Sequence, residues 1–406
     1  MARILSSDGE KILPIETGRQ KISKTAFANL NLIRALSGFV VVFSHFFQLF
    51  IMPLVGRTWA INLAMGSAEY AVLTFFALSG FLIALSIQRN ILNHEYFEWS
   101  EYLISRVARI YPALVASVLL CLILYWISHL PGMNGFGSLS RLSDKYPVSR
   151  TAFSLNRFEV FFTLLQTYAF GPGGYIDANG PLWSLSYEVG FYLMAGFLMT
   201  LIRGKDVARV FSAVGLVLLA LVSIKRGKFL FLHYGTIWVL GVGLFFFIEE
   251  SIQRAAARTK SVAYYRPIVA LFLFLTLTNV LLAFTGFEGP FLRNYFASVA
   301  ITLILFGISR LNRIISNGFA RMADSTYTLY LFHFPCMLFF YSLIRDIYDR
   351  SPILYFATAI AFTLGLIPAL HFLAKLLENR RLWEDVLIRL TKKPMQQLLY
   401  LFNNAG

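Results

Sequence analysis

Charged residues are scarce in this chain of 406 residues: they make up 14% of it, against about 25% in a typical soluble domain. Hydrophobic residues make up 57%, and apolar runs such as "YPALVASVLLCLILYWI" and "VFSAVGLVLLALVSI" recur along the chain. Each run is about long enough, as a helix, to cross a hydrocarbon core of about 30 Å. The composition excludes a soluble globular domain and predicts an all-α fold, a polytopic transmembrane helix bundle.

Cysteines and the usual metal and nucleotide motifs are also scarce or missing. Cys121 and Cys336 both lie inside apolar runs, which favours core packing and excludes a disulfide or zinc framework. No HExxH motif, P-loop or dinucleotide fingerprint is present, so we expect no metal site and no tightly bound cofactor. The first 32 residues lack the apolar core of a cleavable signal peptide, so none is expected.

The net charge of +15 has a simple explanation in a membrane protein. Basic residues gather in cytoplasmic loops and contact anionic headgroups, so we expect membrane lipids and no nucleic acid as partners.

The distribution of basic residues also predicts the topology. A short amphipathic run at 158–170 is ambiguous. If it does not cross and the N-terminus is cytoplasmic, most of the 36 Lys and Arg residues fall on the inside, whereas a crossing there largely removes this bias. We therefore predict that 158–170 lies on the surface or re-enters the protein, and that both termini are cytoplasmic.

The predicted topology comprises a cytoplasmic segment 1–32, a transmembrane domain 33–376, an outer loop at about 131–181 and a basic cytoplasmic tail 377–406. About ten spans are expected, at 33–53, 70–87, 110–130, 182–202, 208–223, 229–248, 267–285, 292–309, 326–344 and 353–376.

The first span carries two ionisable residues, Arg34 and His45, in the stretch "RALSGFVVVFSH". At about 100° per residue they share one helix face, about 16 Å apart along the axis. Ionisable groups inside spans are functional candidates. A packed, hydrogen-bonded histidine is the alternative, and the aligned arginine makes it less attractive.

Small and basic residues mark the next two spans. Ser79 and Gly80, in "FFALSGFLI", form a patch that a neighbouring helix or a ligand can approach. Arg106 and Arg109, in "RVARIYP", are three residues apart and share a face. A guanidinium pair at the membrane surface suits phosphate binding, with simple membrane anchoring as the alternative.

Two later spans add a carboxylate and an imidazole. Glu188, in "GPLWSLSYEVGFYLM", is expected about 9 Å below the outer surface, and His45 about 12 Å below it. A carboxylate beside an imidazole can orient it and favour its protonated form, although Glu188 could instead pair with a loop cation. His333, in "STYTLYLFHFP", is either a ligand-binding residue or a packed histidine.

Taken together, and in this order, these motifs resemble those of the acyltransferase family 3 of integral membrane proteins, over about residues 25–380. The resemblance implies transfer of an acyl group, usually acetyl from acetyl-CoA, to a hydroxyl of an extracytoplasmic carbohydrate or lipid-linked glycan. The expected location is the bacterial cytoplasmic (inner) membrane, and acyl-CoA is a co-substrate. Two departures stand out: Val189 follows Glu188 where many members have a second acidic residue, and the basic tail of about 30 residues leads us to expect no SGNH esterase-like domain after the bundle.

The residues and the resemblance together predict a site in which His45 acts as general base on the acceptor hydroxyl while Glu188 orients the imidazole. A covalent acyl-imidazole is the mechanistic variant. By expected role, the site residues are His45 and Glu188 (catalytic), Arg34, Arg106, Arg109 and Ser79 (acyl-CoA binding), and Trp183, Ser184, Tyr187 and His333 (acceptor binding).

Two other functions also place charges within the membrane. A secondary transporter or flippase does so, but no inverted repeat is evident in the sequence. A membrane glycosyltransferase would want carboxylates at an outer-facing site, where few are available. The acceptor glycan, the acyl group and whether the protein is a homo-oligomer are left open.

Overall fold

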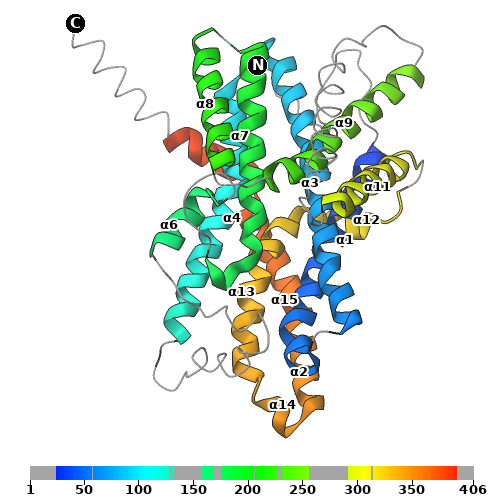
Figure 1. The fold of residues 1–406 in the computed structure, drawn as a ribbon, viewed down its shortest axis with the longest axis vertical. Coiled ribbons are helices and arrows are strands. Elements are labelled where there is room, and N and C mark those ends of the chain that lie inside the picture. Colours follow the sequence, from blue (N-terminus) through cyan, green and yellow to red (C-terminus); the bar gives the residue numbers. More distant parts are fainter. Residues whose placement is uncertain are drawn as a thin grey trace, which may run out of the picture.

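In the computed structural model the described residues are 24–56, 58–128, 130, 157–168, 176–204, 206–225, 230–255, 291–311 and 314–390. These residues form helices, with no strand among them (Figure 1). The long helices are α1 (Lys24–Phe46), α3 (Trp59–His94), α4 (Trp99–Ser128), α7 (Trp183–Arg203), α8 (Asp206–Lys225), α9 (Leu230–Ala255), α11 (Phe291–Ser309), α13 (Thr326–Ile344) and α15 (Pro352–Leu377). The short ones are the π-helix η1 (Phe47–Ile51), α2 (Met52–Val55), α6 (Arg157–Leu165), the 3₁₀ helix η3 (Asp177–Leu182), α12 (Asn317–Met322), the 3₁₀ helix η5 (Ala323–Ser325) and α14 (Ile347–Arg350).

The prediction of an all-α membrane bundle is confirmed. Each predicted span within the described residues falls on a helix, and the window 267–285 lies outside them. Six helical stretches of the described chain are long and apolar enough to cross a membrane. The total of ten spans and the cytoplasmic placement of the termini remain predictions, since residues 1–23 and 391–406 lie outside the description. The ambiguous run at 158–170 contributes α6, which at nine residues is shorter than a span requires.

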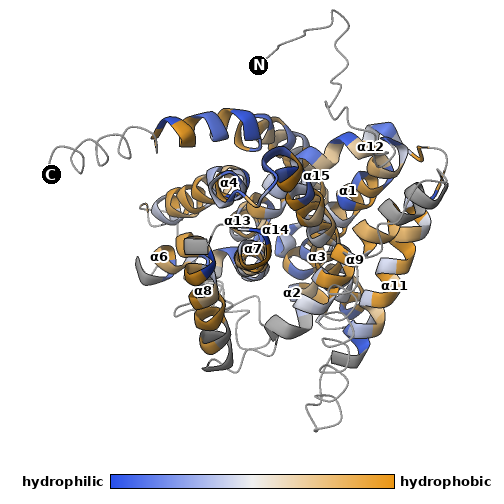
Figure 2. Cartoon of the chain, turned by 90° about the horizontal axis from the view of Figure 1, so that it is seen from above, coloured by the Kyte–Doolittle hydropathy of each residue, from blue (hydrophilic) through white to orange (hydrophobic). Residues whose placement is uncertain are grey.

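Helix α13 occupies the centre of the bundle. Seen from above, it lies among α4, α7, α15, α3 and α1 (Figure 2). The apolar window of Asn317–Ile344 is 78% buried, the largest share among the six candidate spans. Polar groups on α13 must therefore find partners inside the protein, which makes their contacts informative.

Helices α3 and α9 cross at close range because each contributes a glycine to the contact. A Cβ atom added at Gly80 would overlap the carbonyl oxygen of Trp238, and one added at Gly241 would overlap that of Ala77. Such small residues let helix backbones approach each other in membrane proteins. Helix packing therefore explains Gly80 of the small-residue patch.

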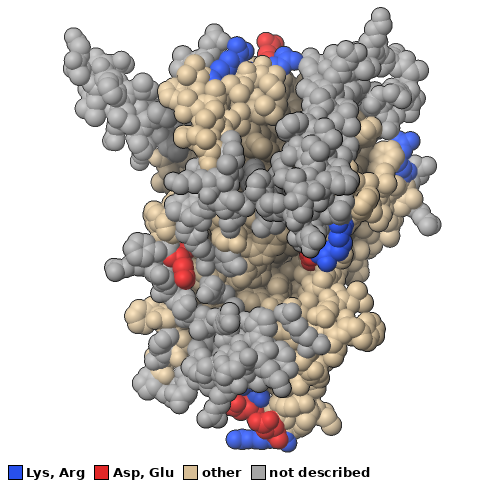
Figure 3. All heavy atoms as spheres, viewed as in Figure 1, with Lys and Arg blue, Asp and Glu red and all other residues tan. Residues whose placement is uncertain are grey.

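Many large hydrophobic side chains are exposed on the outer surface of the described residues, as expected of a surface that faces lipid. On the face drawn in Figure 3, uncharged side chains cover most of the described part, and acidic and basic ones form small groups at its two ends and flanks. Exposed large hydrophobic side chains line α8, at Val210, Phe211, Val214, Val217, Leu218 and Leu221. A stripe of this kind would be an aggregation hazard in water and is expected in lipid.

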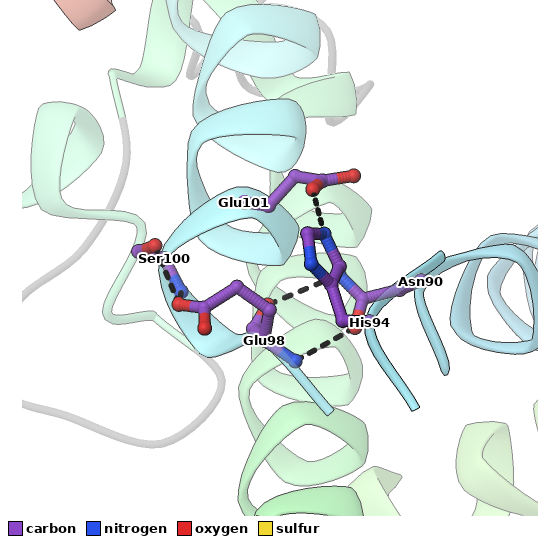
Figure 4. A network of polar contacts seen from close by, with 5 residues as sticks. All are labelled: Asn90, His94, Glu98, Ser100 and Glu101. Carbon is purple, nitrogen blue, oxygen red and sulfur yellow. Dashed lines mark hydrogen bonds and ion pairs between the residues drawn. The ribbon is translucent and has the colours of Figure 1, made fainter. Parts of the chain in front are cut away.

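The connection between α3 and α4 is held by a network of polar side chains (Figure 4). The Asn90 side chain donates to the carbonyl oxygen of Glu98 at 3.1 Å and accepts from its backbone N–H at 2.8 Å. His94 Nε2 lies 2.5 Å from Glu101 Oε2. The backbone N–H of Phe97 donates to the carbonyl of Arg203 at 3.0 Å, so the α3–α4 and α7–α8 connections lie side by side at one end of the bundle.

Candidate active site

A cavity inside the bundle is lined by five of the ten site residues predicted from the sequence, Arg34, Ser79, Arg109, Ser184 and Glu188. It offers about 60 Å³ to water-sized groups, several times the ~10–15 Å³ that one water molecule needs. Its polar lining comes from α1, α3, α4, α7 and α13, with Arg34, Ser79, Arg109, Ser184, Glu188, Thr326, Tyr327 and Tyr330. A second, smaller pocket shares Arg34, Leu78 and Leu82 with it and extends along the N-terminal half of α1 past Phe27 and Leu30.

Two half-buried guanidiniums, those of Arg34 and Arg109, face this cavity. Within the described residues neither makes a hydrogen bond, and each interacts at longer range with the carboxylates of Glu188 and Glu378. Each guanidinium has five N–H donors, so the two arginines offer unused donors to whatever enters the cavity.

The carboxylate of Glu188 is held in place by α3 and by its own helix. Ser79 Oγ donates to Glu188 Oε1 at 3.2 Å, and the Tyr192 hydroxyl donates to the same oxygen. The hydroxyl of Ser79 also lies 3.4 Å from that of Tyr192. Ser79 is thus a cavity residue, whereas its neighbour Gly80 belongs to the helix crossing.

The two arginines of the "RVARIYP" motif have different environments. Arg106 is buried, 6% exposed, and its guanidinium lies over the rings of Tyr102 and Tyr192 at 5.5 and 5.6 Å. Its Nη2 atom donates to Ser86 Oγ at 2.8 Å. The prediction that both arginines form a guanidinium pair at the membrane surface is therefore wrong. Arg106 packs against the ring of Tyr192 inside the protein, and of the two arginines only Arg109 lines the cavity.

Glu378 completes the charged group and is not among the site residues predicted from the sequence. It directly follows α15, and its carboxylate accepts the backbone N–H of Thr328 at 2.7 Å in the first turn of α13. A carboxylate at a helix N-terminus is stabilised by the unpaired N–H groups and the helix dipole. In the sequence Glu378 is the second residue of the predicted basic tail, and no periodicity or motif connects it with a helix that starts 52 residues earlier.

His45 lies at the end of α1, where the helix widens. Its Nδ1 atom is 2.7 Å from Gln48 Oε1, a residue of the π-helix η1. Pro53 has no N–H to continue the ladder of hydrogen bonds, and the chain just before it adopts the π turn. Gln48, not Glu188, is the side chain that orients this imidazole.

His45 meets a second imidazole from α13. The ring centroids of His45 and His333 are 5.2 Å apart, and the ring of Phe334 lies 5.0 Å from that of His45. The ring of Tyr330 is 6.2 Å from that of His333 and also lines the cavity. Tyr330 therefore connects the charged cavity with the histidine pair.

The predicted contact between Glu188 and His45 is not formed, since their hydrogen bonds go to different partners. The reason lies before α7. Ile176, Ala178 and Asn179 are 0% exposed, so the end of the predicted outer loop is buried and α7 begins inside the bundle. A depth counted from residue 182 as the outer edge therefore places Glu188 too close to His45.

The predicted acceptor-binding residues divide between the cavity and the core. Ser184 lines the cavity, with its Oγ 2.7 Å from the hydroxyl of Tyr330. Trp183 and Tyr187 pack with Tyr234 of α9, at ring centroid distances of 5.3 and 5.2 Å. Tyr187 is 1% exposed and belongs to the core.

The described residues include no group of three or more His, Cys, Asp or Glu side chains that could hold a metal ion. What they do bring together, inside an apolar helix bundle, is a charged cavity and an imidazole pair. This combination defines an integral membrane protein with an internal, polar reaction or binding site.

Comparisons with known proteins place the chain in a family. The family model described as "Acyltransferase domain" matches residues 27–372, and the protein belongs to this family, acyltransferase family 3. It is similar to Nodulation protein 10 of Rhizobium leguminosarum bv. viciae, with 29% identity over 177 residues, 43% of this chain and 45% of the relative. The similarity thus spans less than half the length of that relative. No solved structure matches.

Proposed function

We propose that this membrane acyltransferase moves an acyl group, most simply acetyl, from cytoplasmic acyl-CoA to a hydroxyl of an extracytoplasmic carbohydrate or lipid-linked glycan. The bacterial inner membrane is the proposed location. The observation that carries the proposal is the pair of cavity guanidiniums, Arg34 and Arg109, with no hydrogen bond to another described residue. A dianionic diphosphate such as that of coenzyme A is the kind of ligand these donors suit.

The coenzyme would enter along the smaller pocket, on the predicted cytoplasmic side. That pocket runs beside the N-terminal half of α1 and joins the cavity at Arg34. Its walls at Phe27, Leu30 and Phe81 are apolar, so the slim pantetheine arm can pass along it ahead of the phosphates. Arg34 and Arg109 would then hold the anionic part while the arm reaches past Tyr330 toward the histidines.

In the proposed reaction, His45 Nε2 accepts the proton of the acceptor hydroxyl as its oxygen attacks the thioester carbonyl carbon. The carbon–sulfur bond breaks, and the leaving thiolate of coenzyme A takes the proton from the imidazolium. The products are the O-acyl ester and free coenzyme A. Because Gln48 Oε1 accepts from Nδ1, the neutral ring has its lone pair on Nε2, as a general base requires.

Glu188 has a different role here from the one its sequence position suggested. It lies among Ser79, Tyr192 and the two cavity arginines. We propose that it balances the charge of these arginines and keeps them positioned when the cavity is empty. The relative in Rhizobium supports only the general class, and the identity of the acceptor glycan stays open.

The test uses purified protein in lipid nanodiscs. Calorimetric titration with acetyl-CoA should show binding that Arg109→Gln weakens, whereas Arg381→Gln, at an exposed arginine, should leave it unchanged. Transfer is then followed by mass spectrometry of cell-surface glycans from cells with and without the gene. Failure to bind acetyl-CoA at millimolar concentration, or identical glycans in both strains, would refute the proposal.

A further inference from the structure

The two imidazoles of the histidine pair are held in the same way. His333 Nδ1 lies 2.9 Å from the carbonyl oxygen of Leu329, and His45 Nδ1 lies 2.7 Å from Gln48 Oε1. A carbonyl oxygen only accepts hydrogen bonds, so in each ring Nδ1 is the donor. In the neutral rings both Nε2 atoms are therefore acceptors.

The Nε2 atom of His333 is buried and has no hydrogen-bond partner within the described residues. His333 itself is 0% exposed, while its neighbour His45 is half-buried. A buried polar atom without a partner costs about 1–3 kcal/mol, so such atoms are rare unless a ligand or water completes them. Here the unpaired atom belongs to a ring 5.2 Å from that of the proposed general base.

Helix α13 is held at this turn by a clamp from two other segments. Pro335 has no N–H, so it cannot donate to the carbonyl of Leu331, four residues before it. The freed carbonyl instead accepts from Ser117 Oγ of α4 at 2.9 Å and from Asn179 Nδ2 at 2.8 Å. Asn179 Nδ2 is also 3.0 Å from Ser117 Oγ, and both side chains are 0% exposed.

The clamp explains why a proline can lie in the most buried helix. A proline in a helix interior leaves one carbonyl unpaired and costs about 3 kcal/mol or more. Two buried donors are supplied at that carbonyl, one from α4 and one from the segment before α7. Since Leu331 is two residues from His333, the clamp sets where the second imidazole lies.

We propose that His45 and His333 form one recognition site for a polyol, so that the acceptor is bound through two neighbouring hydroxyls. The reacting hydroxyl donates to His45 Nε2, and the adjacent hydroxyl donates to His333 Nε2. This rests on the proposed acyl transfer and deepens it, because it makes His333 specific for a diol. Asn179 and Ser117 are positioning residues that act through the Leu331 carbonyl.

The chemistry of the pair favours this ligand over others. Two neutral acceptors attract two O–H donors, whereas a phosphate or carboxylate would bring its own acceptors against the same lone pairs. The surrounding Phe334 and Tyr330 rings make the site apolar, which disfavours a cationic donor because burying its charge is costly. A sugar ring with adjacent hydroxyls satisfies both conditions.

The first experiment needs no turnover. Protein labelled with ¹⁵N-histidine, which contains six histidines, is studied in lipid bilayers by solid-state NMR, with His45→Gln and His333→Gln used for assignment. Both rings should show the Nδ1–H tautomer. Titration with cis-cyclohexane-1,2-diol should shift the Nε2 resonances of both rings together, and cyclohexanol should not shift both. A diol that shifts neither ring, or only that of His45, overturns the proposal.

The second experiment separates this proposal from acyl transfer itself. His333→Phe should raise the KM for the acceptor about tenfold, which corresponds to about 1.4 kcal/mol, with the KM for acetyl-CoA unchanged. His333→Gln, which returns an amide near the position of Nε2, should recover part of the loss. Asn179→Ala should act in the same direction as His333→Phe, and His94→Gln, in the α3–α4 connection, is the control. If His333→Phe transfers with an unchanged acceptor KM, the diol site is refuted and the proposed acyl transfer is not. If the wild-type protein does not bind acetyl-CoA, the proposed acyl transfer itself is refuted.

Discussion

The cavity and the histidine pair lie next to each other and differ in the charges that they carry. The cavity contains two arginines and the carboxylate of Glu188, with Glu378 close by. The pair contains two imidazoles, which are neutral unless they take up a proton, and the aromatic rings of Phe334 and Tyr330 lie beside them. The charges lie where an anionic coenzyme would be held, and the neutral acceptors lie where a hydroxyl would react.

This separation has a physical advantage for the proposed reaction. A general base works only if it is unprotonated before the reaction, and a neighbouring carboxylate would favour its protonated form. His45 has Gln48 as its partner instead, which orients the ring without adding charge. Keeping Glu188 in the cavity thus leaves His45 available as a base.

The largest effect should come from removing that base. His45→Ala should lower kcat by about 10²–10⁴-fold, the range typical of general-base catalysis, while acetyl-CoA still binds. Single-turnover transfer and calorimetric titration measure the two quantities on one sample. Near-wild-type kcat in this variant would contradict the division of roles between the two regions.

Damage on the charged side should have a different kinetic signature. Arg109→Gln should weaken acetyl-CoA binding by about 10- to 100-fold, because a charge-assisted hydrogen bond contributes about 1.5–3 kcal/mol. The kcat at saturating coenzyme should change little. Arg106→Gln is the matched comparison, since Arg106 touches Ser86, Tyr102 and Tyr192 but not the cavity. Equal losses of coenzyme affinity in both variants would mean that the cavity lining does not decide binding.

The cavity wall formed by α3 can also be disturbed through its contact with α9. Gly241→Ala adds a Cβ that overlaps the carbonyl of Ala77 and forces α9 away from α3, two residues from Ser79. We expect a loss of about 1–3 kcal/mol in stability from such overpacking. Thermal unfolding in detergent measures it, and Gly243→Ala, where a Cβ meets no atom within 4 Å, is the control. A similar melting temperature for the two variants would show that the crossing tolerates separation.

Tyr330 lies between the two regions, and its hydroxyl offers a finer test of how they communicate. Tyr330→Phe keeps the ring but removes the contacts of the hydroxyl with Ser184 and with the carbonyl of Pro181. Each hydrogen bond contributes about 0.5–1.5 kcal/mol, so transfer should fall several-fold with both histidine resonances unmoved. A large shift of the His333 resonance would instead place Tyr330 within the histidine pair.

The smallest effect is expected far from both regions. Glu98 lies between α3 and α4, and its hydrogen bond from Ser100 is the main cause that lowers its pKa below the usual 4.5 (Figure 4). A carboxyl group with a lowered pKa in the folded state stabilises the protein above its unfolded pKa, and this stability is lost as the pH falls through the folded value. Melting temperatures measured from pH 6 to pH 3 should therefore fall slightly less in Ser100→Ala than in the wild type. Transfer activity at neutral pH should be the same in both.

Several site residues could be found without a structure because they break a strong local pattern. Arg34, His45 and Glu188 are ionisable groups in apolar runs, and their cost in a membrane marks them as functional candidates. Glu378 breaks no such pattern, because it directly follows a span, where charged residues are expected. Gln48 lies within the first predicted span but is uncharged, so it stands out less than Arg34 or His45.

The sequence by itself determined that this is a helical membrane protein, roughly where its spans lie and which ionisable groups they carry, because burial in lipid depends on local composition and length. Only the tertiary structure decided which of these groups meet. The depth of a residue along its helix does not tell which residues of other helices lie beside it. Because the start of α7 is buried, Glu188 lies near the cavity arginines. The neighbours of His45 are Gln48 and His333. The Leu331 carbonyl shows the same limit. The sequence predicts, from Pro335, that the Leu331 carbonyl lacks its helical hydrogen bond. Only the packing of the helices shows that Ser117 and Asn179 donate to this carbonyl instead.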